Sequence, residues 1–419
     1  MYDALGDHQG AQVERRRARR LSTSLVLAVP SPDAPLTTNR AKLEPARGCY
    51  LGVRDDPNGK YWGRREANTE DFAQRLGVPV SVAFDYNVYG KPFPTQWALR
   101  QAEHHRAIQI AWEPNDIDAV EDNDYLNNWA REAGKSGVPV FLRFGGEMNG
   151  AWTRWGRNPR TYRAKFRLVH EVMARYAPNV AMVWAPNAVP VSNLDLYYPG
   201  DDVVDWVGIS LYLVRFYDDN LARPGWQDSP SFYIDPFYRK YAARKPLCLV
   251  ECGVSRQSRV EAAPADQFAA ARLQDLFDCI KIRYPRLKMA CLFDRNNIEH
   301  AIPGRQLNDF SLPEGSLALA AMRAEAHDPY FLTKFAADAT SPIGYLPAQT
   351  NFPKGYAGPV AASLSTYALN PVLQVRRNTT SFRRPRPFVF DLPPGEGPLV
   401  VTVLDGHGKP AYSQTTFAP

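Results

Sequence analysis

Two glutamates carry the clearest chemical signal in the sequence. Glu147 follows the apolar run VPVFLRF at residues 138–144, and Glu251 ends the run KPLCLVE at residues 245–251. A single glutamate after a strand is commonly the ion-pair partner of an arginine, but a matched pair favours catalysis. Two carboxyl groups can protonate the oxygen of a glycosidic bond and stabilise or trap the oxocarbenium-like centre that its cleavage creates. The pair therefore predicts glycoside hydrolysis.

Eight short apolar segments, most of them followed by a helical pattern, are the elements that would position these glutamates. This alternation is typical of a parallel sheet. The expected strands are 48–54, 78–84, 106–112, 138–144, 179–185, 203–212, 245–251 and 287–293.

The count of eight predicts a closed (β/α)8 barrel. After Pro159, the residues Tyr162, Phe166, Val169 and Met173 recur at helical spacing, as expected for an outer-ring helix. No GxGxxG motif follows the first strand, which removes the main signal for a dinucleotide-binding sheet. Catalytic groups of such barrels lie at the carboxyl ends of strands. Strands four and seven face each other there, which predicts carboxyl groups about 5 Å apart, as in retaining enzymes.

The sequence divides into three parts. Residues 1–45 combine the basic run RRRARR with LSTSLVLAVPSP, an order that suits either an export signal or a disordered tail. Residues 46–331 form the expected barrel. Residues 332–419 are rich in Pro and Gly around alternating segments, which predicts a small β-rich, sandwich-like module. This module could bind carbohydrate or brace the barrel, and the sequence favours the bracing role.

Composition excludes several functional classes. The 419 residues include 45% hydrophobic and 22% charged residues, and no apolar run reaches the roughly 18 residues of a membrane helix. The net charge of +6 is modest, so neither nucleic-acid binding nor membrane insertion is predicted. The five cysteines show no metal-ligand spacing and are expected to be buried thiols. We predict no metal and no cofactor, and the oligomeric state stays open.

Polar and aromatic residues surround Glu147. Arg143, on the same strand, is expected to point into the barrel mouth and to favour an ionised carboxylate nearby. Asn149, Trp152 and Trp155 follow Glu147 and are candidates for substrate binding, with ordinary packing as the alternative for each tryptophan.

The segment RFGGEMNGAWTRWG at residues 143–156 resembles the acid/base segment of glycoside hydrolase family 26, which includes many endo-β-mannanases. Further segments resemble the family in order, over roughly residues 47–331: IAWEP at 110–114, MVWAPN at 182–187, YYPGDDVVDWVGISLY at 197–212 and PLCLVECG at 246–253. The resemblance implies Glu147 as acid/base and Glu251 as nucleophile of a retaining, endo-acting enzyme. It also implies that Tyr212 hydrogen-bonds the nucleophile and that Trp152 lies under a sugar ring.

One position departs from the family. Its members usually have histidine immediately before the acid/base glutamate, where it contacts the sugar being cleaved, and this chain has Gly146. Either another side chain supplies that contact or a different sugar occupies the subsite, and the open space could admit a branched sugar. The candidate replacements are Glu113, Asp85 and Asn187.

Several functions stay open at this point. The first is a retaining glycoside hydrolase acting on a β-linked, mannan-type polysaccharide. The alternatives are the same mechanism on xylan, mixed-linkage glucan or a bacterial exopolysaccharide, and a carbohydrate-binding barrel without turnover. A polysaccharide partner and a candidate export signal together favour a secreted or periplasmic protein.

Overall fold

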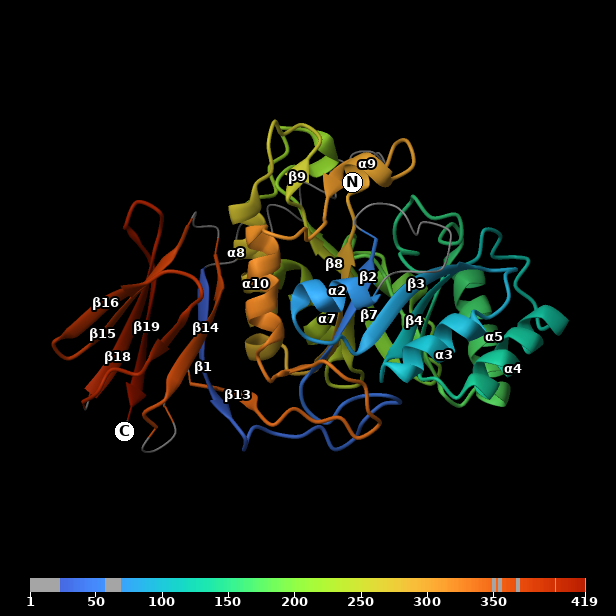
Figure 1. The fold of residues 1–419 in the computed structure, drawn as a ribbon, viewed down its shortest axis with the longest axis horizontal. Helices are drawn as coiled ribbons and strands as arrows, with labels where there is room; N and C mark the ends of the chain where they lie inside the picture. The colour runs from blue at the N-terminus through green and yellow to red at the C-terminus, as the bar shows by residue number, and fades with distance from the viewer. Residues whose placement is uncertain are drawn as a thin grey trace.

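The computed structural model describes residues 23–56, 69–348, 352, 356–366, 370–395 and 397–418. Within these, eight parallel strands form a closed barrel, because β10 pairs with both β8 and β2. This confirms the predicted fold class. The run RRRARR lies outside the described residues. The barrel strands are β2 (Cys49–Asp55), β3 (Val82–Val88), β4 (Ala107–Glu113), β5 (Val140–Phe144), β6 (Val180–Trp184), β7 (Trp206–Leu213), β8 (Leu247–Val254) and β10 (Leu287–Asp294) (Figure 1).

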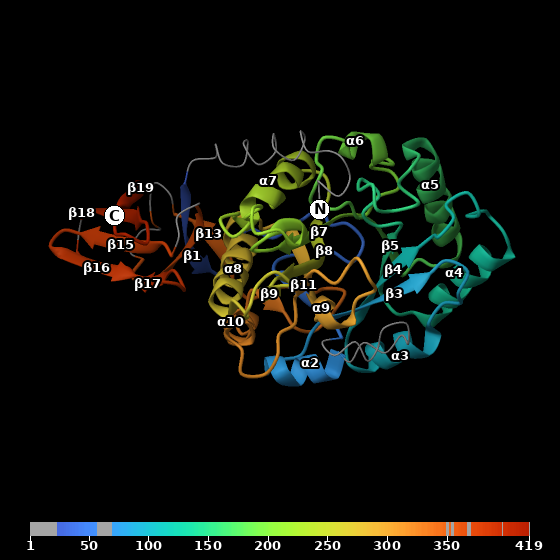
Figure 2. The ribbon, with the colours of Figure 1, turned by 90° about the horizontal axis from the view of Figure 1, so that it is seen from above.

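Helices surround the barrel (Figure 2). The helix predicted after Pro159 is α5, and the Asn158 side chain caps it by accepting hydrogen bonds from the backbone N–H groups of Arg160 and Thr161. The helices are α2 (Thr69–Leu76), α3 (Thr95–Glu103), α4 (Asp124–Ser136), α5 (Pro159–Tyr176), α6 (Leu194–Tyr197), α7 (Pro230–Tyr241), α8 (Asp266–Asp278), α9 (Asn297–His300) and α10 (Leu317–Ala326), with short η2 (Tyr217–Asp219) and η3 (Cys279–Arg283).

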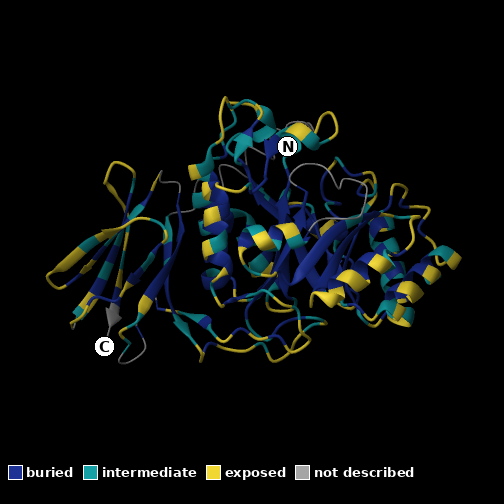
Figure 3. Cartoon of the chain, in the orientation of Figure 1, coloured by how far each residue is buried: buried dark blue, intermediate teal, exposed yellow. Residues whose placement is uncertain are grey.

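Side chains alternate between two cores along each barrel strand. Phe141 belongs to the core inside the barrel, whereas its neighbours Val140 and Leu142 pack between the strands and the outer helices. The strands are therefore buried on both faces, while the helices expose their outer surfaces (Figure 3). All five cysteines are buried and unpaired with one another.

A β-bulge in β8 interrupts this alternation. Ile209 and Ser210 of β7 pair with Leu249 and Glu251, so Val250 is an extra residue in β8. Leu249 faces the outer core and Val250 the inner core. Strict alternation would turn Glu251 outward again, but the bulge lets its side chain follow Val250 toward the barrel interior.

Two four-stranded sheets form a module beside the barrel. Their orders are β13-β1-β14-β17 and β16-β15-β18-β19, and a common apolar core lies between them. The strands are β1 (Ser24–Ser31), β13 (Gly344–Pro347), β14 (Pro359–Ser365), β15 (Val372–Arg377), β16 (Thr380–Arg384), β17 (Val389–Asp391), β18 (Gly397–Leu404) and β19 (Pro410–Ala418).

The position of β1 corrects the interpretation of the amino-terminal segment. The apolar stretch that suited an export signal or a disordered tail is a strand between β13 and β14, with Leu25, Leu27 and Val29 buried. In Figure 1 this blue strand lies against the orange β14. Residues from both ends of the chain therefore build the module, and its boundary is not a single cut near residue 332.

The module is fastened to the barrel by polar and apolar contacts. Arg283 donates to the backbone oxygens of Ser24 and Ser363, at 3.0 and 2.7 Å. Arg386 pairs with Asp275 of α8 at 2.8 Å, and Ile282 packs with alanines of β1 and β14. Among the described residues, no helix has both the length and the apolar character needed to cross a bilayer.

Candidate active site

A cleft of about 1450 Å³ opens at the carboxyl ends of the barrel strands. It contains nearly all the residues selected from the sequence, which come from different strands and the loops after them. The predicted residues that line it are Asp85, Glu113, Arg143, Glu147, Trp152, Trp155, Asn187, Tyr212 and Glu251. Asn149 does not line the cleft.

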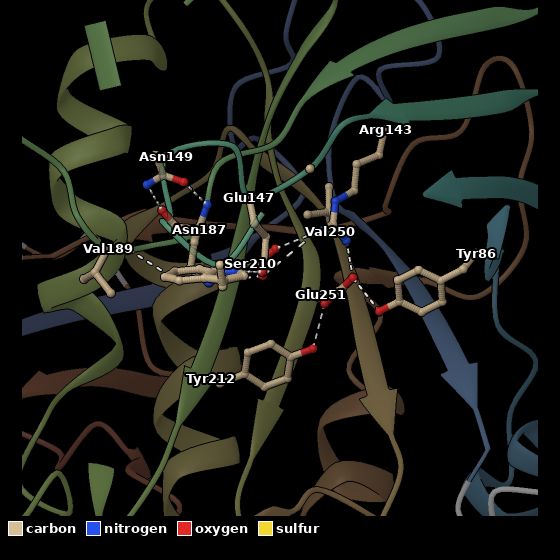
Figure 4. A network of polar contacts seen from close by, with 12 residues as sticks. Tyr86, Arg143, Glu147, Asn149, Asn187, Val189, Ser210, Tyr212, Val250 and Glu251 are labelled. Carbon is tan, nitrogen blue, oxygen red and sulfur yellow. Dashed lines mark hydrogen bonds and ion pairs between the residues drawn. The ribbon is translucent and has the colours of Figure 1, made fainter. Parts of the chain in front are cut away.

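Three donors converge on the carboxylate of Glu251 (Figure 4). Tyr86 donates to Oε1 at 2.7 Å, Tyr212 donates to Oε2 at 2.8 Å, and Arg143 donates to Oε1. Burial, and then the charge of Glu251, raise the pKa of both tyrosines well above the usual value, so both phenols remain donors. The side chain of Glu251 is only 6% exposed. These contacts fix its position and satisfy its buried charge.

The Arg143 guanidinium lies between the two glutamates. Its Nη1 contacts Glu251, while Nη2 donates to Ser210 Oγ at 3.1 Å and lies 4.0 Å from Oε1 of Glu147. Burial disfavours its charge, but the two carboxylates outweigh burial and raise the pKa of Arg143. One permanent positive charge therefore lies beside both carboxyl groups.

Glu147 lies in the turn after β5 rather than at its last residue. Its φ of 59° is left-handed, an uncommon conformation for a residue other than glycine and one that is often found at functional sites. Trp152 Nε1 donates to Oε2 at 2.7 Å, and Asn187 Nδ2 donates to Oε1 at 3.1 Å. At 20% exposure its side chain is more accessible than that of Glu251, as a proton donor to a bound substrate requires.

The space beside Gly146 is filled, which corrects the expectation of room for a branched sugar there. A Cβ at this position would lie 2.7 Å from Nη2 and 2.8 Å from Cζ of Arg143. The indole of Trp155 donates to the backbone oxygen of Gly146 at 2.8 Å. Glycine therefore lets the guanidinium pass close to the backbone, and Trp155 holds that peptide in place.

Asn149 has a structural role instead of the predicted substrate contact. Its Nδ2 donates to the backbone oxygens of Asn187 and Pro190, both at 2.9 Å, and its Oδ1 accepts from the Asn187 N–H at 2.8 Å. Because these bonds occupy its amide and it is buried, Asn149 shapes the loop that carries Asn187.

Glu113 is a further carboxyl group in the cleft. Burial is the largest cause that raises its pKa, from 4.5 to about 7, and the nearby charges of Glu251 and Glu147 act in the same direction against the opposing effect of Arg143. Asp85 instead lies 3.6 Å from Nε of Arg54. Within the described residues, no group of His, Cys, Asp and Glu side chains is arranged to hold a metal ion.

Sequence reasoning missed Tyr86. Val82 and Phe84 face the inside of the barrel, and Tyr86 is the next residue on that face at the carboxyl end of β3. The period-two pattern could have identified it, because a polar tip after two inward apolar residues is expected to reach the barrel mouth.

A closed (β/α)8 barrel with two glutamates meeting one arginine at its carboxyl end is an architecture of barrel glycoside hydrolases. Solved structures share the fold. A modular endo-β-1,4-mannanase from Cellulomonas fimi superposes over 90% of this chain and 96% of its own, with a TM-score of 0.51 and 16% identity. The catalytic domain of an endo-β-1,4-mannanase from Bacillus sp. gives 0.50 and 14%, over 74% of this chain and 97% of that domain.

Residues 95–223 match the family model described as glycosyl hydrolase family 26. The match includes Glu147 and Tyr212 but ends before Glu251.

Two curated relatives are similar over shorter stretches. A β-1,3-xylanase from Vibrio sp. is 36% identical over 95 residues, which is 22% of this chain and 20% of that protein. Endoglucanase H from Acetivibrio thermocellus is 32% identical over 160 residues, which is 34% of this chain and 18% of that protein. The chain thus spans a fifth or less of the length of these relatives.

Proposed function

We propose that this protein hydrolyses a β-linked polysaccharide, as an endo-acting enzyme, with retention of configuration. The observation that carries the proposal is the arrangement of Glu147 and Glu251 around the Arg143 guanidinium in an open cleft. The family match over the Glu147 segment supports the same reaction.

In the proposed mechanism, Glu147 donates its proton to the glycosidic oxygen while Glu251 attacks the anomeric carbon. The bond to the leaving sugar breaks, and a covalent glycosyl–enzyme intermediate forms on Glu251. Glu147, now a carboxylate, removes a proton from water, which releases the sugar and restores both glutamates. Tyr86, Tyr212 and Arg143 position Glu251, and Trp152 and Asn187 position Glu147.

The sugar at the cleaved position is the second part of the proposal. Gly146 supplies no side-chain hydrogen bond to that sugar, and the loss of one costs about 0.5 to 1.5 kcal/mol unless a neighbour compensates. We therefore propose that linear mannan is a poor substrate. Because two relatives are named a β-1,3-xylanase and an endoglucanase, xylan and glucan polymers should be tested beside linear mannan.

Activated aryl glycosides test the two roles separately. Glu251→Ala should abolish turnover, whereas Glu147→Ala should retain activity on a substrate whose leaving group needs no proton. Azide should increase the turnover of Glu147→Ala by forming a glycosyl azide, because the Glu251 intermediate remains accessible.

Two results would contradict the proposal. Full activity of Glu251→Ala would refute the nucleophile, and an α-configured first product from a β-linked substrate would refute retention. Product anomers are read by proton NMR during the first minutes of hydrolysis. A screen of linear mannan, xylan, mixed-linkage glucan and an acidic exopolysaccharide then identifies the polymer, and high activity confined to linear mannan would refute the substrate proposal.

A further inference from the structure

One wall of the cleft is formed by a single stretch of chain that the proposed mechanism does not use. It runs from the end of β7 through η2 into α7. Among its residues, Phe216, Tyr217, Asp228, Phe232 and Tyr233 line the same cleft as the two glutamates. A sugar unit beyond the cleaved bond could therefore reach this wall while the polymer occupies the catalytic pair.

A carboxylate is held at the centre of this wall. Tyr233 donates to Oδ2 of Asp228 at 2.7 Å, and the Tyr217 hydroxyl contacts both that oxygen and the Tyr233 hydroxyl. Within the described part of the chain, no cation pairs with Asp228, and its Oδ1 has no hydrogen-bond donor. Burial, and next the charge of Asp228, raise the pKa of Tyr233 well above normal, so its hydroxyl remains a donor.

The wall is fixed before any ligand binds. Asp219 accepts hydrogen bonds from Ser258 Oγ at 3.0 Å and from the Val260 N–H at 2.9 Å, which ties η2 to the segment after β8. A Cβ on Gly225 would lie 2.5 Å from the Tyr217 ring and 2.7 Å from the Val214 oxygen, so the ring packs directly on the glycine backbone. Such preorganisation reduces the entropic cost of binding a flexible polymer.

The chemistry of the wall suits a sugar. A sugar unit offers hydroxyl donors around its edge and C–H groups on its faces, so it binds where a carboxylate oxygen lies among aromatic rings. Oδ1 of Asp228 provides the acceptor, Tyr217 and Tyr233 provide rings beside it, and Phe216 and Phe232 line the same cleft. Asp228 is partly exposed and lines the cleft, so its Oδ1, which no protein donor of the described residues contacts, is accessible to a hydroxyl group of a ligand.

We propose that Asp228, held by Tyr217 and Tyr233, is the centre of a distal saccharide subsite that binds the hydroxyl groups of a sugar unit not being cleaved. The inference rests on the proposed function for the identity of the polymer. It adds that the enzyme recognises several consecutive units and gains its efficiency from chain length.

Binding to an inactive enzyme tests the subsite apart from catalysis. In the Glu251→Gln background, trisaccharides and hexasaccharides of β-1,4-mannan, β-1,3-xylan and β-1,4-glucan are titrated by calorimetry. We expect at least one hexasaccharide to bind more tightly than its trisaccharide. Adding Asp228→Asn should weaken hexasaccharide binding about tenfold, the effect of losing a hydrogen bond to a charged acceptor, with a smaller effect on the trisaccharide.

Two further variants control the test. Asp202→Asn removes an exposed carboxylate that pairs with Arg167 outside the cleft, so it should leave hexasaccharide binding unchanged. Tyr233→Phe keeps the carboxylate of Asp228 but removes one of its donors, so it should weaken hexasaccharide binding by a smaller factor than Asp228→Asn. It tests the subsite in case Asp228→Asn does not fold.

The outcomes separate the two proposals. Equal hexasaccharide affinity with and without Asp228→Asn, or no binding by any oligosaccharide of the series, would overturn the subsite. Length-dependent binding that Asp228→Asn abolishes would support the subsite even if the enzyme with Glu251 intact hydrolysed none of these sugars. That last result would overturn the proposed function alone.

Discussion

Arg143 passes so close to Gly146 that a single methyl group on the glycine would overlap the guanidinium. The added Cβ would lie 2.7 Å from Nη2 and 2.8 Å from Cζ, while the same guanidinium contacts Glu251 and Ser210. The identity of residue 146 and the position of the charge beside Glu251 are therefore coupled. The glycine is a requirement of this arginine position rather than simply the absence of a histidine.

Gly146→Ala should consequently act through Arg143. We expect kcat to fall by roughly 10- to 100-fold, because a hydrogen bond to a charged group contributes about 1.5 to 3 kcal/mol. In an Arg143→Ala background the same substitution should cost little, and a double-mutant cycle of kcat measures this coupling. Gly408→Ala lies in a turn of the module, where a Cβ would meet no atom within 4 Å but the φ of 79° strains any side chain. It controls for a general loss of stability and should leave kcat unchanged. Additive effects of Gly146→Ala and Arg143→Ala would contradict the coupling.

Tyr86 should matter as much as Tyr212, although only Tyr212 was selected from the sequence. Each donates one hydrogen bond to Glu251, so Tyr86→Phe and Tyr212→Phe should each lower kcat about tenfold. Tyr50→Phe is the matched control, because its hydroxyl donates to the Ala336 oxygen instead. This control should lose stability without losing kcat. Unchanged kcat in Tyr86→Phe would show that Arg143 and Tyr212 suffice to position the nucleophile.

The raised pKa of Glu113 predicts a pH dependence of stability. Burial raises it from 4.5 to about 7, so the native protein keeps a proton that the unfolded chain has already released. The free energy of unfolding should therefore decrease as pH rises from about 4.5 to about 7, with no further contribution from this group above that range. Glu113→Gln should remove this part of the decrease in the free energy of unfolding, which is measured by urea unfolding at each pH.

Glu132→Gln, in α4, is the control for that measurement, because its carboxylate makes only an exposed contact with Lys135. The quantity to compare is the stability difference between each variant and the wild-type protein across pH. A constant difference for Glu113→Gln would mean that Glu113 is ionised throughout the range.

The barrel could be predicted from sequence because its signal is local. Each strand is buried on both faces and reads as an apolar run, and all eight expected segments coincide with observed strands to within a few residues. The same pattern placed Arg143 at the mouth, whereas Tyr212 was selected from the resemblance to the family. It could also have placed Tyr86, which continues the inward face of Val82 and Phe84.

The orientation of Glu251 could not be predicted in this way. It depends on the bulge at Val250, and an extra apolar residue between Leu249 and Glu251 leaves no mark on a hydrophobic pattern. Glu147 likewise lies after the end of the strand and adopts a left-handed conformation. The neighbouring Gly145 and Gly146 indicate a turn but do not predict a positive φ at the glutamate. Asn149 was a candidate for substrate binding because it follows Glu147, and the sequence did not indicate its partners, which lie in a loop about forty residues later in the chain.

The amino-terminal strand is the clearest case of a non-local determinant. A basic run followed by an apolar stretch describes a signal peptide and a buried strand equally well. What decides is pairing across the whole chain: Ser24 is in register with Ser365, and the hydroxyls of Thr23 and Thr366, 343 positions apart, lie 2.9 Å from each other. A search of local sequence cannot identify such partners.

The central place of β1 leads to the final prediction, which concerns stability rather than catalysis. Leu27 is fully buried in the core between the two sheets, so Leu27→Ala should lower the unfolding free energy by about 2 to 5 kcal/mol. Leu36→Ala removes the same atoms from a leucine that is 52% exposed, and it should change the unfolding free energy by less than about 0.5 kcal/mol. The module contacts α7, α8 and η3 through Ser231, Asp275 and Ile282, none of which lines the cleft. At a temperature where both variants are folded, kcat should therefore equal that of the wild-type protein. The nine tryptophans all precede residue 227. Urea unfolding monitored by tryptophan fluorescence therefore reports on the barrel. If Leu27→Ala shifts the fluorescence transition to lower urea, the barrel depends on the module for its stability. If the fluorescence transition is unchanged but the circular dichroism of the β-sheets is lost at lower urea, the barrel and the module unfold separately.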